Sequence, residues 1–385
     1  MLLDRYETKI IQSGLKMVMY VAVRKLFKCD VYFMHSLDKG LYCKIQSKNN
    51  LNNDDINNLK NMMDDLVNKD LKITKKVITV KDAYNFYIKI NEIEKANNIL
   101  YSNDKTVTIY ELCGYYNYFL SDMPVSTGSL KNYILSYLGD NSVVLSTPYL
   151  SDYSLPTFTN QDMILQSFSD YKNWCNLVHV NYISDLNMLV SESKIKEFIK
   201  KNDIMMDNQI YELANLIRKE NKKLVLLGGP SSSGKTTSTK KLALYMSAIG
   251  LNPIYLGLDD YFKEKVDSPK LENGEYDFES IDCIDLDLFN KQLTQILNGE
   301  EVSVPTYNFV EGKKEYKGRF IKLKENDIIL IEGLHCLNEA LTSTIPKDTK
   351  LKVYISPFMP LSVDRHNHIS TVDIRLLRRI VRDNR

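Results

Sequence analysis

The spacing of hydrophobic positions changes near residue 200, and this change divides the chain into two parts. In the first part, segments with a helical period mix with segments in which apolar and polar residues alternate. Helices are predicted over residues 6–27, 52–70 and 160–177, and strands over residues 30–36, 40–46 and 106–120. We therefore expect an α+β domain over residues 1–200, followed by a helical connector at residues 201–222.

From residue 223 onward, short runs of apolar residues alternate with helical patterns. Strands are predicted over residues 223–227, 252–258, 327–331 and 350–356, and helices over residues 235–249 and 284–298. This alternation is typical of a parallel sheet covered by helices on both faces, so residues 223–385 are predicted to form an α/β domain. Ligands bind such sheets beyond the carboxyl ends of the strands, where functional residues are therefore expected.

The composition of the chain narrows the classes of molecule that the protein could bind and the compartment in which it is expected. The 385 residues carry a formal net charge of +1 with 26% charged residues, which gives no global field for nucleic acid or an anionic membrane. Six cysteines are scattered without a CxxC pair, a usage typical of reduced thiols in a cytosolic protein. The N-terminus has no signal-peptide core, and no apolar run approaches the ~18 residues of a membrane span. We expect a soluble, cytoplasmic protein without a membrane partner.

The stretch GPSSSGKT at residues 229–236 follows the first strand of the second part and opens its first helix. It fits GxxxxGK[ST], a loop whose backbone N–H groups surround phosphate oxygens at the positive end of the helix. Lys235 is expected to reach the β- and γ-phosphates of ATP, and the Thr236 hydroxyl to bind Mg²⁺. The alternative is a Ser/Gly-rich turn with a surface lysine, but the flanking strand and helix favour a nucleotide site. The predicted nucleotide contacts are Gly229, Pro230, Ser231, Ser232, Ser233, Gly234, Lys235, Thr236 and Thr237.

Residues after the neighbouring strands narrow the class of P-loop protein. A GTPase would carry an NKxD segment, which this chain lacks, and a mechanical ATPase would normally carry an Asp after an apolar strand. Here the strand at 327–331 is followed by Glu332. This residue is either a Mg²⁺ ligand, directly or through water, or an ordinary turn glutamate.

Asp259 and Asp260 follow the predicted strand 252–258, beside the phosphate loop. One of these carboxylates can accept the proton of an attacking hydroxyl while the γ-phosphoryl group transfers. The alternative is a pair of turn or N-cap aspartates.

Four arginines share one face of a predicted C-terminal helix, namely Arg375, Arg378, Arg379 and Arg382. The apolar residues Leu376, Leu377, Ile380 and Val381 occupy the other face. A row of guanidinium groups can neutralise charge that spreads during phosphoryl transfer. The alternatives are a solvated basic face and a helix that contacts nucleic acid.

Six segments, in this order and spacing, resemble the uridine kinase-like branch of P-loop kinases, which also includes relatives of phosphoribulokinase. They are PSSSGKTT, LDDYF, YDFESIDCIDLDLFN, GEEVSVPTYNF, ILIEGLHCLN and RLLRRIVRD. The chain is most similar to the longer bacterial nucleoside kinases, in which this domain follows a module similar to part of threonyl-tRNA synthetase. The resemblance is strong across residues 223–385 and weaker before them, for example in HSLDKGLYC at residues 35–43.

The resemblance implies ATP-dependent phosphorylation of a nucleoside 5′-hydroxyl. It implies that Asp259 is the catalytic base and that Lys235 and Thr236 contact phosphate and Mg²⁺. Glu332 would be the metal ligand of the EG motif. Glu279 would bind the ribose hydroxyls, Tyr307 would face the base, and Arg375 and Arg378 would be lid or acceptor-side arginines.

Three features depart from that family pattern. Gly312 stands where nucleoside-specific members tend to offer a histidine to the base, and His368 stands where an arginine is expected. The chain stops at Arg385, within the helix that forms the lid, so we expect an incomplete kinase domain. His366 and His368 have the spacing of a metal pair, but the sequence offers no third ligand nearby, so we expect no metal there.

The role of the first domain is left open by its residues. Only His35 and His179 precede residue 228, which excludes a histidine cluster for aminoacyl-tRNA editing. Cys43 near His35 is interpreted as a buried cysteine beside a satisfied histidine, not as a catalytic pair. We expect a scaffold or regulatory module, with RNA binding and oligomer formation both open.

The sequence thus predicts a kinase that transfers phosphate from Mg·ATP to a small-molecule nucleoside. Two alternatives remain: a kinase for another alcohol such as a sugar phosphate, and an ATP-binding regulator with little or no turnover.

Overall fold

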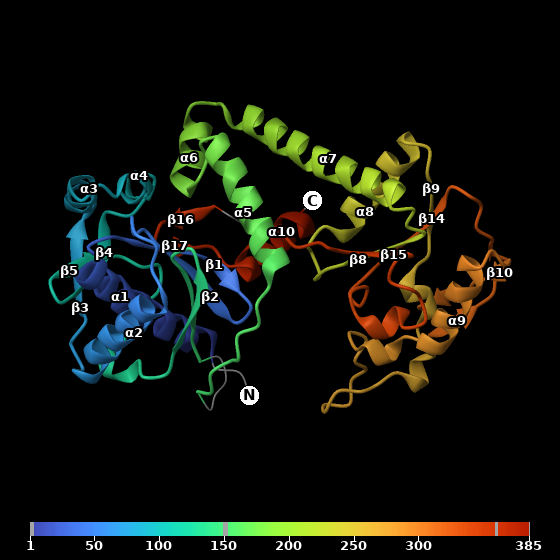
Figure 1. Ribbon diagram of the computed structural model, residues 1–385, viewed down its shortest axis with the longest axis horizontal. Coiled ribbons are helices and arrows are strands. Elements are labelled where there is room, and N and C mark those ends of the chain that lie inside the picture. The colour runs from blue at the N-terminus through green and yellow to red at the C-terminus, as the bar shows by residue number, and fades with distance from the viewer. Residues whose placement is uncertain (1–3, 149–152, 359–360, 385) are drawn as a thin grey trace. The chain divides into compact units, whose positions relative to one another are not determined.

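The computed structural model describes residues 4–148, 153–358 and 361–384 (Figure 1). The chain forms two compact units. The N-terminal unit comprises Met1–Lys196 with Phe358–Ile374, and the C-terminal unit comprises Glu197–Pro357 with Arg375–Arg385. The boundaries predicted from the sequence, 1–200, 201–222 and 223–385, did not include this return of the chain to the first unit.

The N-terminal unit contains two antiparallel sheets, so its predicted α+β class is confirmed. The first sheet has the order β1 (Val31–Leu37), β2 (Gly40–Ile45), β7 (Ser142–Ser146), β6 (Ile134–Gly139). The second has the order β3 (Thr74–Thr79), β4 (Thr106–Leu112), β5 (Tyr115–Asn117). The helices are α1 (Arg5–Phe27), α2 (Asn53–Asn68), α3 (Val80–Lys89), α4 (Ile93–Leu100), α5 (Asp162–Leu177) and α6 (Ile183–Ser191).

Helix α1 forms the centre of this unit. Every residue from Ser13 to Val23 is buried, because the helix is apolar on nearly all sides along this stretch. Helix α2 packs against it and begins with a capping box, in which the Asn52 side chain and Asp55 satisfy each other's backbone N–H groups. The predicted strand 106–120 is in fact two strands, β4 and β5, because Cys113 and Gly114 form a turn with positive φ.

The C-terminal unit is built on a parallel sheet, as predicted. Its strand order is β15 (Lys350–Tyr354), β8 (Leu224–Gly228), β14 (Asp327–Gly333), β9 (Asn252–Tyr255). The long helix α7 (Ile195–Lys219) enters this unit, followed by α8 (Lys235–Ala248) and α9 (Leu286–Leu297). Two short hairpins complete it, β10 (Val302–Ser303) with β13 (Phe320–Ile321) and β11 (Thr306–Asn308) with β12 (Lys313–Glu315).

Successive residues of each central strand pack into different cores. Leu224, Leu226, Ile329 and Ile331 belong to a cluster with residues of α9 such as Phe289 and Leu293. Val225, Leu227, Ile328 and Leu330 belong to a cluster with residues of α7 and α8 such as Ile217 and Met246. Helices therefore cover both faces of the sheet, which leaves its carboxyl edge for a ligand.

The last described segment returns to the N-terminal unit and leaves it again. The hairpin of β16 (Ser362–Asp364) and β17 (Asn367–His368) belongs to that unit. Helix α10 (Thr371–Asp383) starts in the N-terminal unit, and its residues from Arg375 onward belong to the C-terminal unit.

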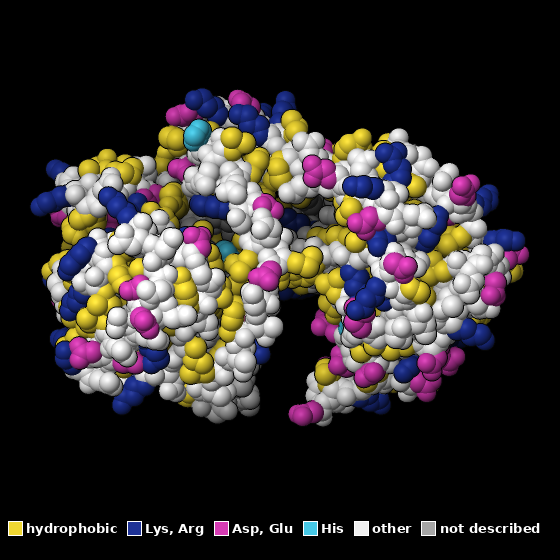
Figure 2. Space-filling model, viewed as in Figure 1, with side chains coloured by type: hydrophobic (Ala, Val, Ile, Leu, Met, Phe, Trp, Pro, Cys, Tyr) yellow, Lys and Arg dark blue, Asp and Glu magenta, His cyan; other side chains and the backbone are white. Residues whose placement is uncertain are grey.

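Two surface features complete the description. No helix in the described part of the chain is long and apolar enough to cross a membrane. Figure 2 shows Lys and Arg side chains interspersed with Asp and Glu over the visible face, in line with the net charge of +1.

Candidate active site

The loop at residues 229–234 has a geometry that only glycine permits at two positions. A Cβ on Gly229 would lie 2.1 Å from the Ile355 carbonyl oxygen, and Gly234 has φ +98°. Gly234 is also the N-cap residue of α8, and no side chain caps this helix. The N–H groups of the first helical turn therefore stay available to an anion.

Other polar groups of the loop fit a phosphate ligand. The Ser233 hydroxyl is buried and has no hydrogen-bond partner among the described residues. The Lys235 ammonium donates only to the Pro230 carbonyl, at 3.1 Å, among the hydrogen bonds of the described residues. An orphaned buried hydroxyl, an ammonium group and an uncapped helix are the donors that a nucleotide phosphate chain requires.

Thr236 and Glu332 meet at the carboxyl edge of the sheet. The Thr236 hydroxyl donates to a Glu332 carboxylate oxygen at 2.9 Å, and the Thr239 hydroxyl lies 3.5 Å from the other oxygen. Strand β14 pairs in parallel with β8, and this register places Gly333 beside Gly228. Both residues predicted to bind Mg²⁺ are thus together, and their oxygen atoms are of the type that this ion prefers.

The turn after β9 holds the two aspartates, Asp259 and Asp260. Strand β9 ends at Tyr255, and residues Leu258–Tyr261 form a short 3₁₀ turn where the sequence predicted further strand. Asp260 accepts the Tyr307 backbone N–H and the Arg319 guanidinium, each at 3.3 Å. In the described part of the chain, no hydrogen bond or ion pair occupies the Asp259 side chain.

The electrostatic surroundings of Asp259 suit proton transfer. Partial removal from water raises the pKa of this carboxyl, and the negative charges of Asp260 and Glu332 raise it further, whereas Lys235 lowers it. The side chain remains exposed on one side. A free carboxylate with a raised pKa beside a phosphate loop can accept a proton from a bound hydroxyl.

The two residues predicted to bind the acceptor differ in exposure: Tyr307 is buried, whereas Glu279 is exposed. The Tyr307 side chain is 7% exposed, and its hydroxyl donates to the Lys263 carbonyl at 3.1 Å. Its ring makes edge contacts with Phe262 and Phe309 at centroid distances of 5.7 and 5.1 Å. Phe309 is 66% exposed, so it is the ring of this cluster that offers a face to a ligand. The sequence analysis missed it, because Phe309 lies in the turn that follows β11 (Thr306–Asn308), where no strand periodicity marks its position.

Glu279 and Gly312 are two further positions that the sequence analysis related to the acceptor. Glu279 is exposed, and its backbone N–H donates to Asp277. Its carboxylate makes no hydrogen bond or ion pair with the described residues, and the structure brings it into no direct contact with Asp259. Gly312 has φ +69°, and a Cβ there would lie 2.8 Å from the Lys265 Cβ. A histidine at this position would need a local shift.

Three of the four arginines of α10 face the phosphate loop. Arg375 and Arg378 each donate through Nε, at 3.1 Å, to the carbonyls of Ser231 and Ser232, and Arg382 reaches the Ser232 hydroxyl at 3.3 Å. Arg379 instead pairs with Asp383 at 3.5 Å. The structure therefore brings the predicted arginines Arg375 and Arg378 to the loop. The apolar face of the helix stays exposed at Leu376, Leu377, Ile380 and Val381.

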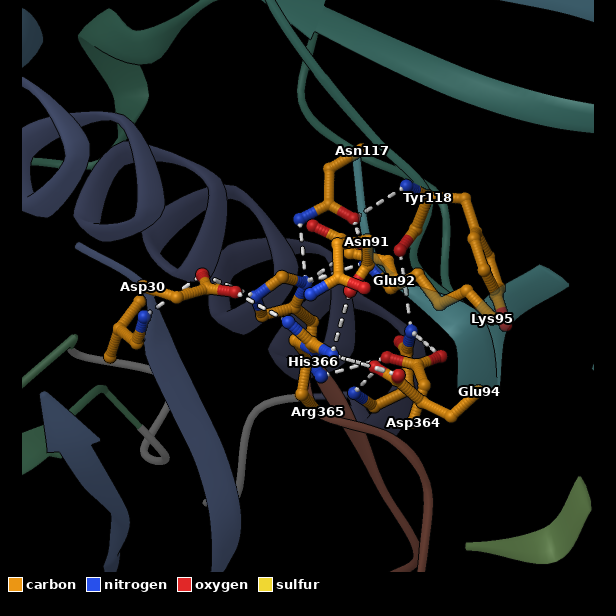
Figure 3. Close-up of polar contacts among 12 residues, drawn as sticks. Asp30, Asn91, Glu92, Glu94, Lys95, Asn117, Tyr118, Asp364, Arg365 and His366 are labelled. Atoms are coloured by element: carbon orange, nitrogen blue, oxygen red, sulfur yellow. Dashed lines mark hydrogen bonds and ion pairs between the residues drawn. The ribbon is translucent and has the colours of Figure 1, made fainter. Parts of the chain in front are cut away.

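His366 has possible metal ligands around it that the sequence analysis did not foresee. Atoms of Asp30, Glu92 and His366 lie within 4.8 Å of one another. The Lys95 ammonium already lies 2.8 Å from Glu92 and 2.5 Å from His366 Nδ1. Figure 3 shows Lys95 within this group of polar residues. Because a lysine supplies the positive charge there, we interpret this group as a buried ionic network.

The remaining histidines of interest belong to the N-terminal unit and are neutral. His35 stacks against Tyr42 and Phe168, and burial lowers its pKa to about 4. Cys43 donates to the Leu41 carbonyl at 3.3 Å, and burial raises its pKa. Burial also lowers the pKa of His368 to about 3. These contacts agree with a structural interpretation of Cys43 and His35.

The C-terminal part of the chain is similar to known proteins. Residues 224–385 match the family model described as Phosphoribulokinase / Uridine kinase family. Uridine kinases of Borrelia duttonii and Leuconostoc citreum are 29% and 28% identical over 161 and 155 residues. These alignments cover 42% and 40% of this chain and 67% and 65% of the relatives, so the chain spans about two thirds of their length.

Two solved structures are also similar in part. One is a putative fructose transport system kinase from Silicibacter sp., with 17% identity and a TM-score of 0.32. The match covers 46% of this chain and 83% of that one. The other is a possible uridine kinase from Bacillus stearothermophilus, with 21% identity and a TM-score of 0.28 over 34% and 70% of the two chains.

Proposed function

We propose that the C-terminal unit transfers the γ-phosphoryl group of ATP to a hydroxyl of a nucleoside. The observation that carries this proposal is the unoccupied carboxylate of Asp259 beside the phosphate loop. A nucleotide-binding protein without transfer chemistry has no need of a free carboxylate with a raised pKa at this edge of the sheet. The similarity of residues 224–385 to uridine kinases supports a nucleoside as the acceptor.

The residues present fit Mg·ATP. The loop N–H groups, the Ser233 hydroxyl and Lys235 would hold the phosphates, and Thr236 and Glu332 would hold Mg²⁺. Bound Mg·ATP supplies the phosphoryl group and an electrophilic phosphorus atom. Asp259 accepts the proton of the acceptor hydroxyl, which turns this oxygen into a better nucleophile. Arg375 and Arg378 donate to the region where negative charge spreads during transfer.

The acceptor would lie between Asp259 and the aromatic cluster of Phe262, Tyr307 and Phe309. The exposed ring of Phe309 can stack against a base, while Tyr307 supports that ring from the interior. The free carboxylate of Glu279 is proposed to accept hydrogen bonds from sugar hydroxyls. Without a histidine at position 312, selectivity among bases is expected to be loose.

A competing function is an ATP-binding regulator with little turnover. The observation that favours it is that α10, which carries the arginines, buries none of its described residues. A kinase for another alcohol, such as a sugar phosphate, is the second alternative.

Measurement of ADP release separates these functions. The purified protein with Mg·ATP is tested with ribonucleosides, sugar phosphates and no acceptor, and Lys235→Ala serves as the matched control. We expect release that depends on a nucleoside and is abolished in the control. Release with sugar phosphates alone would contradict the nucleoside assignment. ATP binding without acceptor-dependent release would favour the regulator.

A further inference from the structure

Part of the sequence that matches the kinase family belongs to the N-terminal unit. The match covers residues 224–385, whereas Phe358–Ile374 packs with Met1–Lys196. Within this segment, β16 and β17 form a hairpin around the turn at Arg365 and His366. The inference drawn from this hairpin rests on the proposed phosphoryl transfer.

Arg365 ties the hairpin to three parts of the N-terminal unit. Its guanidinium bonds both carboxylate oxygens of Glu94, one of them at 2.9 Å, and lies 3.3 Å from Asp30. Its carbonyl accepts the Phe33 N–H at 2.9 Å, at a register irregularity of the edge strand β1. A bidentate arginine–carboxylate pair fixes orientation as well as distance, so Arg365 holds the turn in one position.

His366 is fully buried at the centre of this network (Figure 3). Its Nε2 atom lies 3.0 Å from Asp30, and its Nδ1 atom faces the Lys95 ammonium and the Asn117 amide at 2.5 and 3.1 Å. Burial opposes ionisation of Asp30, but His366 and the nearby cations Arg24 and Lys95 lower its pKa. Each polar atom of the imidazole ring thus has a partner, and removal of the ring would leave buried groups unpaired.

The turn itself is also braced. Asp364 accepts the backbone N–H groups of His366 and Asn367 at 2.7 and 3.1 Å. The Asn367 side chain donates to the Tyr118 carbonyl and accepts from the Leu120 N–H, at 3.3 and 3.2 Å. The hairpin is therefore a rigid part of the N-terminal unit and not a loose connection.

Helix α10 follows this hairpin directly and has little support of its own. It spans 13 residues, none of which is buried. A helix of this length is marginal in water without packing. The Ser370 hydroxyl accepts the Asp373 N–H at 3.2 Å and so caps the first turn. Only five positions separate Ser370 from Arg375, the first arginine that contacts the phosphate loop.

We propose that the hairpin of Ser362–His368 anchors the start of α10, so that Arg365 and His366 are positioning residues for phosphoryl transfer. The anchor fixes where α10 begins, and the same helix carries Arg375 and Arg378, which contact the phosphate loop. It gives the N-terminal unit a role in the reaction without a ligand of its own.

The test compares hairpin variants with a matched control from the same unit. Arg365→Met and His366→Leu remove the anchor, and His366→Gln keeps one donor and one acceptor. Thr127→Val is the control, because the Thr127 hydroxyl is buried and bonds Leu66 and Leu71 far from the hairpin in sequence. We measure kcat, the KM for the nucleoside, the Kd for Mg·ATP, and hydrogen exchange over residues 371–383.

We expect kcat to fall about 10- to 100-fold in Arg365→Met and His366→Leu, since small misplacements of charged groups carry costs of this size. The Kd for Mg·ATP should stay within about twofold, because the loop at 229–236 is untouched. Exchange in α10 should accelerate, His366→Gln should restore most of kcat, and Thr127→Val should leave kcat and α10 exchange unchanged. If Thr127→Val lowers kcat as much as the hairpin variants, the anchor proposal is wrong.

Two further outcomes separate this proposal from the kinase assignment. If the unmodified protein transfers no phosphate but hairpin variants still accelerate exchange in α10, the anchor stands and the proposed function falls. If transfer is normal and α10 exchange does not respond to either hairpin variant, the anchor falls alone. Should Arg365→Met not fold, Arg365→Lys keeps the charge but not the bidentate geometry, and an intermediate kcat is expected.

Discussion

The hydroxyl of Thr236 donates a hydrogen bond to Glu332 across 96 positions of sequence, at 2.9 Å. The parallel pairing of β8 with β14 places the two residues together, because Glu332 lies near the carboxyl end of β14 and Thr236 lies in the first turn of α8, which follows β8 through the phosphate loop. Glu332→Gln removes the charge that would hold Mg²⁺. We expect the Mg²⁺ concentration for half-maximal activity to rise by about 10- to 100-fold, the range seen when support of a metal site is lost.

A magnesium titration at saturating ATP checks this expectation. Thr294→Val is the matched control, because the Thr294 hydroxyl bonds the Asn290 carbonyl within α9, away from the loop. An unchanged Mg²⁺ requirement in Glu332→Gln would show that this carboxylate is only a structural acceptor for Thr236.

Asp259 and Asp260 should behave differently although they are adjacent. Asp260 is engaged by Tyr307 and Arg319, whereas Asp259 has no partner among the described residues. Asp259→Asn should lower kcat by about 10²–10⁴, the usual cost of losing a general base, with ATP binding preserved. Asp260→Asn should mainly raise the KM for the acceptor, since it weakens the hydrogen bond that Asp260 accepts from the Tyr307 backbone N–H. Equal losses of kcat in both variants would refute the assignment.

The pH profile gives an independent check on Asp259. A base acts in its deprotonated form, and the pKa of Asp259 is raised by partial burial and by the charges of Asp260 and Glu332. The acidic limb of kcat/KM should therefore lie above the range usual for an aspartate. Asp260→Asn removes one of these charges, so the limb should move to lower pH. A shift to higher pH would contradict the proposed interaction.

The parts of this site that were predicted from sequence are local or lie at strand ends. The phosphate loop is one contiguous motif, Glu332 lies near the carboxyl end of the apolar strand β14, and Asp259 lies in the turn after β9, which pairs in parallel with β14. The hairpin at Ser362–His368 was not predicted, because its partner Lys95 lies 271 positions from His366 and no periodicity reports such a contact. The burial of Tyr307 behind Phe309 was missed for the same reason: it depends on Lys263 and Phe262, which belong to another segment.

Sugar hydroxyls should matter more than the base. Glu279 offers a free carboxylate, and a site built to bind hydroxyls rejects analogues that lack them. Ribonucleosides should therefore give a higher kcat/KM than 2′-deoxy and 2′,3′-dideoxy nucleosides, and Glu279→Gln should reduce this preference. Initial rates with the ribo, 2′-deoxy and 2′,3′-dideoxy forms of uridine and of cytidine measure this preference. Equal rates for ribo- and dideoxynucleosides would remove Glu279 from the acceptor site.

The stability of the N-terminal unit should fall as the pH drops below 6.5. Burial lowers the pKa of His35 to about 4 and of His368 to about 3, below the ordinary value of 6.5. Between these values the unfolded chain binds protons that the folded unit does not, so folding is fully favoured above 6.5 and weakened below it. The loss from His35 is at most about 3 kcal/mol.

Hydrogen exchange of α1 between pH 7 and 4.5, corrected for the intrinsic rate, measures this stability. His35→Phe keeps the stack with Tyr42 and Phe168 but cannot titrate, so its stability should depend less on pH than that of the unmodified protein. The same slope in both proteins would show that His35 is not the titrating group.

Arg378 and Arg379 provide a matched pair on one helix. Arg378 donates to the Ser232 carbonyl at 3.1 Å, whereas Arg379 pairs with Asp383 and is directed away from the loop contacts. Both substitutions with glutamine remove one positive charge from α10, so they change the net charge equally.

Only Arg378→Gln removes a donor from the place where negative charge spreads, and we expect it to lower kcat by about 10²-fold, as loss of one such donor does in other enzymes. Arg379→Gln should leave kcat unchanged, and neither variant should change the Kd for Mg·ATP by more than about twofold, because the loop itself supplies most phosphate contacts. Equal effects of the two substitutions would mean that α10 acts through its overall charge, and the contacts seen at Ser231 and Ser232 would then have no specific part in transfer.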